Sequence, residues 1–425
     1  MERRSRFFYG WLIVAIAGIG MTLTYGIRNS FSVFFPSILA EFGWSRGNTA
    51  IMLSLSIFVY GIVAPAAGGL ADHWKPRKIM FIGIILLGLS TACCAFATRL
   101  WHFYLFFGIL APVGMALSGW PLLGPALANW FVSRRGLAIG LGQIGMGLSF
   151  AYGMFAEIAI SRLGWRPAYL VLAVILVLLL IPIYLLFFRY RPEDKDMTAY
   201  GSTEAPAHQN ITEKVSVPHG SDFRVWNLGQ ALKTYQLWLL VLSNFFYWGI
   251  GSYLVLAHQI KFVEEAGYSS LFATSVLALF GIFIIAGELS ASLSDWLGRE
   301  ATVIIATALA IGALVALVFV RDTSRDWLLY IYACCFGYSA GLYTPTIFSG
   351  TADIFHGRHF GAIAGLLLTG MGVGGAIGPW LGGFIYDLFG SYIIAFVFCM
   401  ICFALACISF IIAAPRNAAK LRSRA

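Results

Sequence analysis

Long apolar stretches alternate with short polar ones along almost the whole chain. Twelve of the stretches are long enough to cross a bilayer, which takes about 20 apolar residues in a helix. We therefore predict an all-α integral membrane protein with twelve transmembrane helices. The predicted spans are 9–36, 47–71, 79–98, 102–129, 136–160, 167–188, 235–260, 270–293, 301–320, 327–350, 360–386 and 391–413.

Composition agrees with a membrane location. Of the 425 residues, 60% are hydrophobic and 11% are charged, whereas soluble globular chains carry about 25% charged residues. The seven cysteines lie in apolar segments without the spacing of metal ligands or of a disulfide framework, so we expect apolar fillers and no metal site. The first apolar run is too long for a signal-peptide core and has no small-residue cleavage site after it, which predicts a retained first helix.

One connection and the basic residues together predict the topology. Residues 190–233 are polar and lack a hydrophobic period, so we expect a flexible linker between domains 1–189 and 234–425. With both termini placed in the cytoplasm, 20 of the 28 Lys and Arg residues fall on the inner side and seven on the outer side. The positive-inside rule favours this orientation. It also explains the net charge of +9 without a nucleic-acid partner.

The two predicted domains repeat each other. Asp72 follows span 2 and Asp295 follows span 8, 223 residues later. The stretch at 130–147 recurs at 354–372 with nearly the same offset. These repeats predict two pseudo-symmetric six-helix bundles. Transporters built from such repeats place the substrate at the interface of the halves, near the bilayer midplane.

With these motifs the chain resembles the major facilitator superfamily over essentially its full length. Gly68 and Asp72 match the signature Gly-x-x-x-Asp after span 2, with Arg77 following, and Asp295 and Arg299 form the second copy. The resemblance implies that Asp72, Arg77, Asp295 and Arg299 latch helix ends together at the cytoplasmic face. The alternative is that they are solvated loop charges. The pattern departs from the family at His73, Lys75 and Ala291.

Three further stretches resemble the branch of monocarboxylate transporters and oxalate–formate antiporters. They are "FYGW" at 8–11, "SFSVFFPSILAEFGWSRG" at 30–47 and "WFVSRRGLAIG" at 130–140. This resemblance implies transport of small organic anions. Members of the branch that carry small carboxylates usually have an arginine in span 8. This chain has no cation there and has Glu288 instead, which leaves the substrate open.

Arg28 lies inside the first apolar span, where a guanidinium facing hydrocarbon would be costly. Tyr25, Asn29 and Ser32 share its face at helical spacing and form a polar stripe, which we expect to face a cavity. An arginine fork can hold a carboxylate bidentately, and a phenol or amide can complete the site. The alternative is a structural arginine, bound to helix-end carbonyls or permanently paired with an acid.

Glu288 is the other prominent charge at membrane depth. A carboxyl group in a low dielectric tends to hold a proton and can release it when a cation approaches. Glu288 is therefore a candidate proton carrier, a counter-ion to Arg28, or a glutamate bonded to a neighbouring helix. Weaker candidates for the cavity wall, all equally compatible with packing roles, are Asn244, Tyr247 and Tyr338; Glu157 and His258 lie nearer the outer face.

The combined hypothesis is a secondary active transporter that works by alternating access. Arg28, with Tyr25 and Asn29, would bind a small organic anion, most simply a monocarboxylate, and Glu288 would carry a proton. The alternatives are a proton-independent anion exchanger, an efflux carrier for other small molecules, or a transporter-like sensor. We expect no enzymatic activity and no cofactor, since no HExxH or Gly-x-Ser-x-Gly motif is present. A monomer in a bacterial inner membrane is the expected form.

Overall fold

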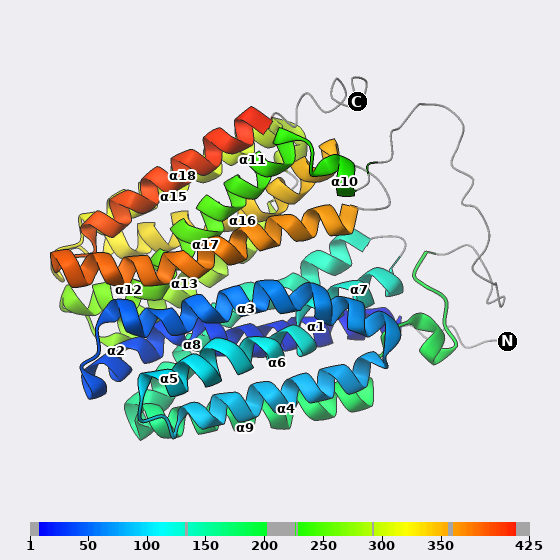
Figure 1. Ribbon diagram of the computed structural model, residues 1–425, viewed down its shortest axis with the longest axis horizontal. Helices are drawn as coiled ribbons and strands as arrows, with labels where there is room; N and C mark the ends of the chain where they lie inside the picture. The colour runs from blue at the N-terminus through cyan, green and yellow to red at the C-terminus, as the bar shows by residue number, and fades with distance from the viewer. Residues whose placement is uncertain are drawn as a thin grey trace.

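Apolar helices make up almost all of the structure, and they lie in two stacked groups (Figure 1). The computed structural model describes residues 8–131, 135–201, 226, 228–290, 293–355 and 360–413, without the side chains at 69, 71–73, 135–137, 295 and 360–362. Within these residues there is no β-strand. The predicted fold class is confirmed: the protein is an all-α membrane protein with twelve spanning helices in two bundles of six.

The first bundle contains spans 1 to 6. Span 1 is interrupted at Ser30, whose hydroxyl donates to the carbonyl of Ile27 at 2.9 Å. Pro36 lies six residues later and removes a backbone donor. The elements are α1 (Tyr9–Asn29) with α2 (Phe31–Phe42), α3 (Arg46–His73), α4 (Pro76–Cys94), α5 (Leu100–Phe103) with η1 (Tyr104–Leu110), α6 (Ala111–Ser118) and α7 (Trp120–Trp130), α8 (Arg135–Leu163), and α9 (Trp165–Pro182) with η2 (Ile183–Phe187).

The second bundle contains spans 7 to 12. Span 7 is π-helical in its middle, at the glycine-containing stretch "FFYWGIGS"; such segments are frequent at functional sites. The elements are α11 (Tyr235–Asn244) with η4 (Phe245–Ser252) and α12 (Tyr253–Glu265), α13 (Ser270–Leu289), α15 (Arg299–Val318), α16 (Trp327–Ile354), α17 (Phe360–Phe389) and α18 (Ile393–Ala413); the short helices η3 (Pro192–Lys195), α10 (Leu228–Ala231) and α14 (Leu293–Leu297) lie between spans.

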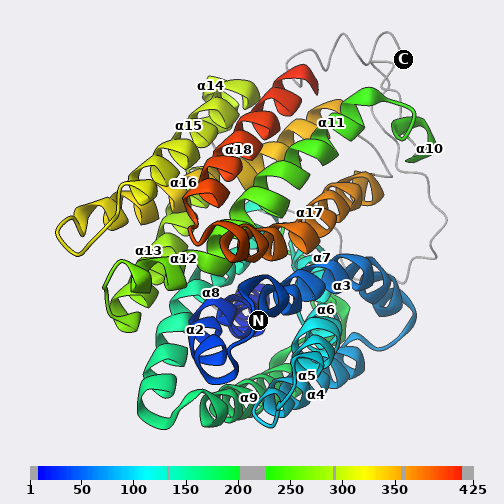
Figure 2. The same ribbon diagram turned by 60° about the vertical axis from the view of Figure 1, so that its left-hand side comes forward.

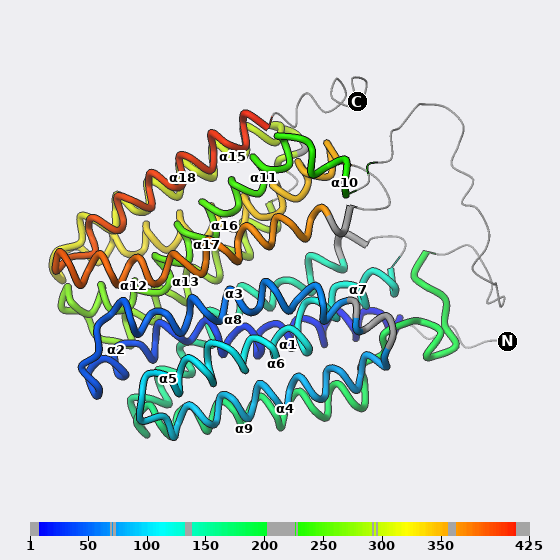
Figure 3. Tube along the Cα trace, in the orientation of Figure 1, coloured from blue at the N-terminus to red at the C-terminus, as the bar shows by residue number. Residues whose placement is uncertain are grey.

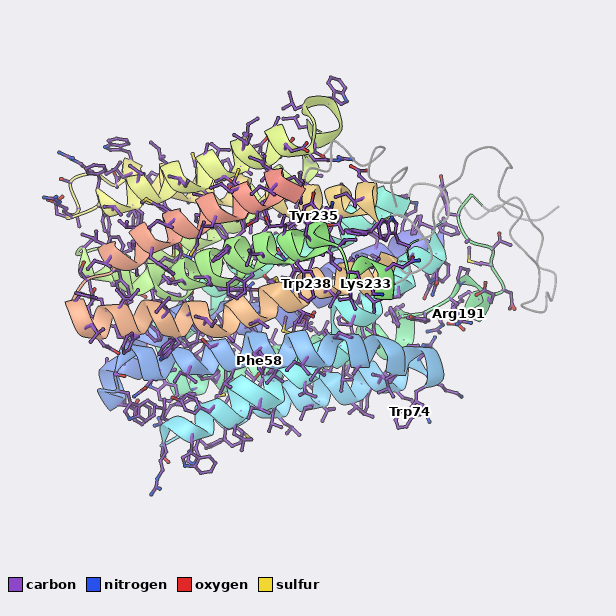
Figure 4. All side chains as sticks on the ribbon, turned by 45° about the horizontal axis from the view of Figure 1, so that its top comes forward. Phe58, Trp74, Arg191, Lys233, Tyr235 and Trp238 are labelled. Atoms are coloured by element: carbon purple, nitrogen blue, oxygen red, sulfur yellow. The ribbon has the colours of Figure 1, made fainter. Side chains whose placement is uncertain are left out.

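The outer surface of the molecule suits a bilayer. Among the described residues, eleven spans are long and apolar enough to cross it, and α16 is the twelfth and more polar one. Large apolar side chains such as Leu89 and Leu178 are more than half exposed on this surface. Exposed aromatic rings gather at helix ends, including Trp74 and Trp238 in Figure 4. Such rings are enriched at membrane–water interfaces.

We call the face where α1 begins and α18 ends the terminal face, and the opposite one the far face (Figure 1). The beginning of the predicted linker packs against the terminal face of the first bundle (Figure 3). The backbone N–H of Tyr200 donates to the carbonyl of Trp130 at 2.9 Å. The ring of Tyr200 contacts the rings of Phe8 and Phe131. Residues 202–225 of the predicted linker lie outside the described part.

The most extensive contacts between the bundles are those of α3 with α17 and of α8 with α13 (Figure 2). Both crossings use glycine. A β-carbon on Gly147 of α8 would lie 2.7 Å from the carbonyl oxygen of Gly281 of α13. A β-carbon on Gly61 of α3 would lie 3.4 Å from the Cα of Gly372 of α17. The helices of the two halves therefore approach backbone to backbone, as small residues permit in membrane helices.

Candidate functional site

Arg28 lies at mid-depth in the last turn of α1, and its side chain is only 4% exposed. Its Nη2 donates to the hydroxyl of Tyr253 at a long 3.5 Å. Its Nε and Nη1 are buried without an acceptor among the described residues. A buried donor that lacks a partner costs about 1–3 kcal/mol. This guanidinium is therefore arranged for an acceptor that the described residues do not supply.

Three tyrosine rings surround this guanidinium. The Cζ of Arg28 lies 4.7 Å from the ring centre of Tyr25, 5.3 Å from that of Tyr60 and 5.9 Å from that of Tyr253. Tyr25 and Tyr60 share a hydrogen bond of 2.6 Å between their hydroxyls. Aromatic faces stabilise a buried cation by cation–π attraction while leaving its N–H groups available to an anion. Tyr25 is thus beside Arg28, as the sequence predicts, and Tyr60 and Tyr253 come from other helices.

A cavity of about 380 Å³ adjoins this cluster. Its wall comes from α1, α3, α7 and α8 of the first bundle and from α11, η4, α12, α13, α16 and α17 of the second. Arg28 lies at its mid-depth end. Phe348 near the end of α16 and Ala364 near the start of α17 lie toward the terminal face. The cavity therefore lies between the two bundles and extends from mid-depth toward the terminal face.

Glu288 lines the same cavity from the last turn of α13. Its Oε2 is buried without a hydrogen-bond partner among the described residues. The described side chains form no ion pair between Glu288 and Arg28. A cation and a carboxyl group thus share one cavity wall, one from each bundle, without being joined.

The other predicted site residues fall at different distances from this cavity. Asn244 lines it, and its Nδ2 donates to the carbonyl of Leu367 at 2.8 Å. Asn29 lies beside Arg28 but donates to Ser149 of α8 at 2.7 Å; it lines a smaller adjoining pocket. The amides of both asparagines are therefore already engaged with neighbouring helices.

Tyr247 and Tyr338 do not line the cavity. Tyr247 is fully buried inside the second bundle, where its ring stacks on Tyr343 at 3.6 Å and its hydroxyl bonds to Ser339. In an α-helix, Tyr247 would lie on one face with Asn244, three residues earlier. The chain is π-helical from residue 245, so this spacing does not hold there. Tyr247 contributes packing between spans 7 and 10.

Sequence reasoning missed most of the aromatic wall. Tyr60, Trp120 and Tyr253 line the cavity, yet nothing in their local sequence separates them from other membrane aromatics. Trp248, from the π-helical stretch of span 7, also lines the cavity. Its indole N–H donates to the hydroxyl of Thr344 at 2.8 Å.

The far face is closed by a polar cluster around Arg46, at the start of α3. Arg46 forms an ion pair with Glu265 of α12, donates to the hydroxyl of Tyr392 at 2.8 Å, and lies 3.5 Å from the ring centre of Tyr386. Asp387 of α17 accepts from the backbone N–H groups of Arg46 at 3.1 Å and of Gly47 at 2.8 Å. A carboxylate of the second bundle thus caps a helix of the first.

The predicted latch residues lie at the terminal face. Arg77 donates through Nε to the carbonyl of Phe188 at 2.7 Å, within the first bundle. Arg299 donates to Asp353 at 2.9 Å, within the second bundle. Both arginines therefore tie helix ends inside their own half. Asp72 and Asp295 belong to α3 and α14, but their side chains lie outside the described part.

No group of His, Cys, Asp and Glu among the described residues could hold a metal ion. The seven cysteines are free thiols, and Cys94, Cys399, Cys402 and Cys407 are buried in apolar surroundings. His258 donates through Nε2 to the carbonyl of Pro379 at 2.8 Å, and its Nδ1 lies 3.2 Å from the hydroxyl of Tyr392. It belongs to the far-face cluster and not to the cavity. Arg28 and Glu288 are thus the charged groups of the described cavity wall.

Comparison with known proteins gives consistent matches over the whole chain. The Major Facilitator Superfamily model matches residues 11–349 and 323–425. Monocarboxylate transporter 13 of Rattus norvegicus is 29% identical over 401 residues, covering 92% of this chain and 85% of its own. Monocarboxylate transporter 11 of Homo sapiens is 28% identical over 407 residues, covering 92% and 79%.

A bacterial relative and a solved structure extend these matches. The uncharacterized MFS-type transporter YcxA of Bacillus subtilis (strain 168) is 23% identical over 396 residues, covering 92% of this chain and 91% of its own. The fold is similar to a crystal structure of a bacterial homologue of the human lysosomal transporter Spinster, described as inward-facing and unoccupied. That match has a TM-score of 0.68 at 14% identity and covers 100% of this chain and 99% of the other.

Proposed function

Since the chain belongs to the Major Facilitator Superfamily, we propose that it is a secondary active transporter for a small organic anion, a monocarboxylate, moved together with a proton by alternating access. The observation that carries this proposal is Arg28. Its buried Nε and Nη1 lack an acceptor among the described residues, and it borders a cavity between the bundles. A carboxylate presents two acceptor oxygens that match this fork. The names of the relatives, monocarboxylate transporters 11 and 13, support the same substrate class.

The two faces of the molecule support alternating access. The cavity extends toward the terminal face, whereas the far face is closed by Arg46, Asp387 and their partners. We assign the terminal face to the cytoplasm from the distribution of basic residues. The described conformation is then the inward-facing one, the state in which the Spinster homologue was solved. Opening the far face requires breaking the Arg46 cluster.

Glu288 is the proposed site of the coupled proton. Its carboxyl group shares the cavity with the carboxylate site and has no cationic partner among the described residues. A protonated Glu288 adds no negative charge when the substrate carboxylate neutralises Arg28. The loaded carrier then has no uncompensated charge in its cavity, which lowers the cost of the conformational change in a low dielectric.

The proposal is tested by uptake into proteoliposomes containing the purified protein. We expect an acidic outside medium to drive accumulation of a labelled monocarboxylate from a panel of such acids. Arg28→Ala should remove this uptake, because the buried carboxylate would lose its charged partner. Arg162→Ala is the matched control, since Arg162 is an exposed arginine in the last turn of α8. Undiminished uptake by Arg28→Ala would overturn the site.

A proton-independent exchanger is the second candidate, and it keeps the same anion site. Arg28 alone could hold a carboxylate on the way in and another on the way out. Counterflow of labelled against unlabelled acid distinguishes the two functions. Exchange that proceeds equally at every pH, with no uptake driven by a pH gradient, would favour the exchanger.

A further inference from the structure

We infer that the substrate is a monocarboxylate with an apolar body of aromatic size, and not a two- or three-carbon acid. The inference rests on the proposed function, since it takes Arg28 as the carboxylate site. It adds which kind of substrate body the rest of the cavity binds. Three observations carry it: the size of the cavity, the chemistry of its wall, and the engagement of its polar groups.

The cavity is too large for a very small acid. A volume of about 380 Å³ corresponds to about a dozen water molecules at roughly 30 Å³ each. An acid with about six non-hydrogen atoms would leave much of it to water. The cavity is also long. Met21 and Arg28 both line it, and seven residues of α-helix span about 10 Å at about 1.5 Å per residue. This length accommodates a carboxylate, a short link and a ring.

The wall beyond Arg28 is aromatic and thioether in character. Trp and Phe rings offer flat apolar faces, and methionine side chains are polarizable and adapt to the shape of a bound ring. A ligand body held by such a wall gains from leaving water, whereas a hydrated small acid would leave the wall without contact. The apolar side chains of this wall include Met21, Trp120, Met146, Trp248, Phe348 and Leu368.

Several polar groups of the wall already bond to other parts of the protein. The indole N–H of Trp248 donates to Thr344, and the Thr344 hydroxyl donates to the carbonyl of Ala340 at 2.9 Å. The amide of Asn244 donates to Leu367. Among the described residues of the wall, the fully buried donors that lack an acceptor are those of Arg28, which mark an anionic subsite, and the aromatic and methionine side chains form an apolar subsite.

Matched ligands separate the two subsites in a binding experiment on the full-length protein in nanodiscs. Acetate and pyruvate probe the anionic subsite alone, phenylacetate and indole-3-acetate probe both, and phenylacetamide probes the apolar subsite without charge. We expect phenylacetate to bind at least about tenfold more tightly than acetate, and phenylacetamide to bind at least about tenfold more weakly than phenylacetate. Calorimetry measures each dissociation constant.

A variant of the wall tests the location of the apolar subsite. Phe348→Ala should weaken phenylacetate binding by about tenfold and leave acetate binding unchanged. Phe58→Ala is the control, since Phe58 is 38% exposed on the outer surface of α3 (Figure 4). Circular dichroism and thermal unfolding confirm that both variants fold. Equal losses for phenylacetate and acetate in a folded Phe348→Ala would overturn the assignment of this wall.

The outcomes distinguish this inference from the proposed function. Acetate or pyruvate binding as tightly as phenylacetate would overturn the aromatic body and leave a monocarboxylate carrier standing. Phenylacetamide binding as tightly as phenylacetate would overturn the carboxylate site itself, and with it the proposed function.

Discussion

Arg28 and Arg46 are both arginines set among tyrosine rings, yet their environments differ in one respect. Arg46 is satisfied by the protein, through the carboxylate of Glu265 and the hydroxyl of Tyr392. Arg28 has three rings nearby but no carboxylate, and two of its donors lack acceptors among the described residues. The difference indicates that Arg46 joins the two bundles, whereas Arg28 is left for a ligand. Burial and aromatic neighbours alone would not have separated the two roles.

The largest effect on transport is expected from a substitution of Arg28. Arg28→Lys keeps the charge but loses the fork, so a carboxylate can no longer be held by two parallel bonds. Losing a charge-assisted hydrogen bond costs about 1.5–3 kcal/mol, which is about a 10- to 150-fold loss of affinity. Initial uptake rates over a range of substrate concentrations measure it. The same exchange at Arg162 should change transport by less than about twofold, because that side chain is exposed; a wild-type KM for Arg28→Lys would contradict the bidentate site.

The second largest effect is expected at Glu288, and it tests the role of this carboxyl group separately from that of Arg28. Glu288→Gln retains the shape of the side chain but cannot exchange a proton. We expect uptake driven by a pH gradient to fall by about tenfold or more, because the glutamine side chain cannot take up and release the coupled proton. Counterflow of the anion should continue. Glu193→Gln is the control on an exposed glutamate of η3. Full pH-driven uptake by Glu288→Gln would assign the proton to another group or to none.

The third effect concerns the closed face. Asp387→Asn removes a negative charge from the start of α3, where helix capping and the helix dipole are together worth about 0.5–2 kcal/mol. The equilibrium should shift toward an open far face, which hydrogen–deuterium exchange detects as faster exchange in residues 43–50 and 384–392. Asp326→Asn is the control, because Asp326 is exposed at the start of α16 without a side-chain capping bond. Unchanged exchange in Asp387→Asn would mean that the cap does not hold this face closed.

The smallest effect is expected at the ring that faces Arg28 from α3. Tyr60→Phe retains the aromatic face but removes the hydroxyl that bonds to Tyr25. A neutral hydrogen bond contributes about 0.5–1.5 kcal/mol, so the substrate KM should rise by about two- to tenfold without loss of maximal rate. Tyr235→Phe, on the exposed side of α11, should leave the KM unchanged. A larger loss than that of Arg28→Lys would show that the hydroxyl pair, and not the guanidinium, positions the substrate.

Much of the fold could be predicted from the sequence, because membrane helices satisfy their own backbone hydrogen bonds and are recognised by long apolar runs. The break of span 1 at Ser30 and the π-helical stretch in span 7 could not, since they depend on how neighbouring helices pack. The more polar span α16 was still predicted, at 327–350, and it packs between α13 and α15, so it needs fewer lipid-facing side chains.

Only part of the candidate site could be predicted from the sequence. Arg28 and Glu288 stood out because an ionisable side chain inside an apolar run must have a compensating environment. Tyr60 and Tyr253 did not, since periodicity describes one helix at a time and does not say which helices meet. Arg46 is one of the seven basic residues that the sequence places on the outer side, although the structure gives it partners on α12, on α17 and at Tyr392 of the other bundle.

The glycine crossing of α8 and α13 has a consequence for how fast such a carrier can turn over. Where Gly147 and Gly281 meet, the two backbones are in direct contact, with the side chains of Phe150 and Ile285 beside them, so the glycines themselves have no rotamer to change when the crossing angle changes. The Arg46 cluster resists motion differently, through polar bonds that water can replace. The glycine crossing and the Arg46 cluster are separate parts of the molecule. Substitutions in the Arg46 cluster can therefore change the rate of conformational exchange without changing the helix crossing.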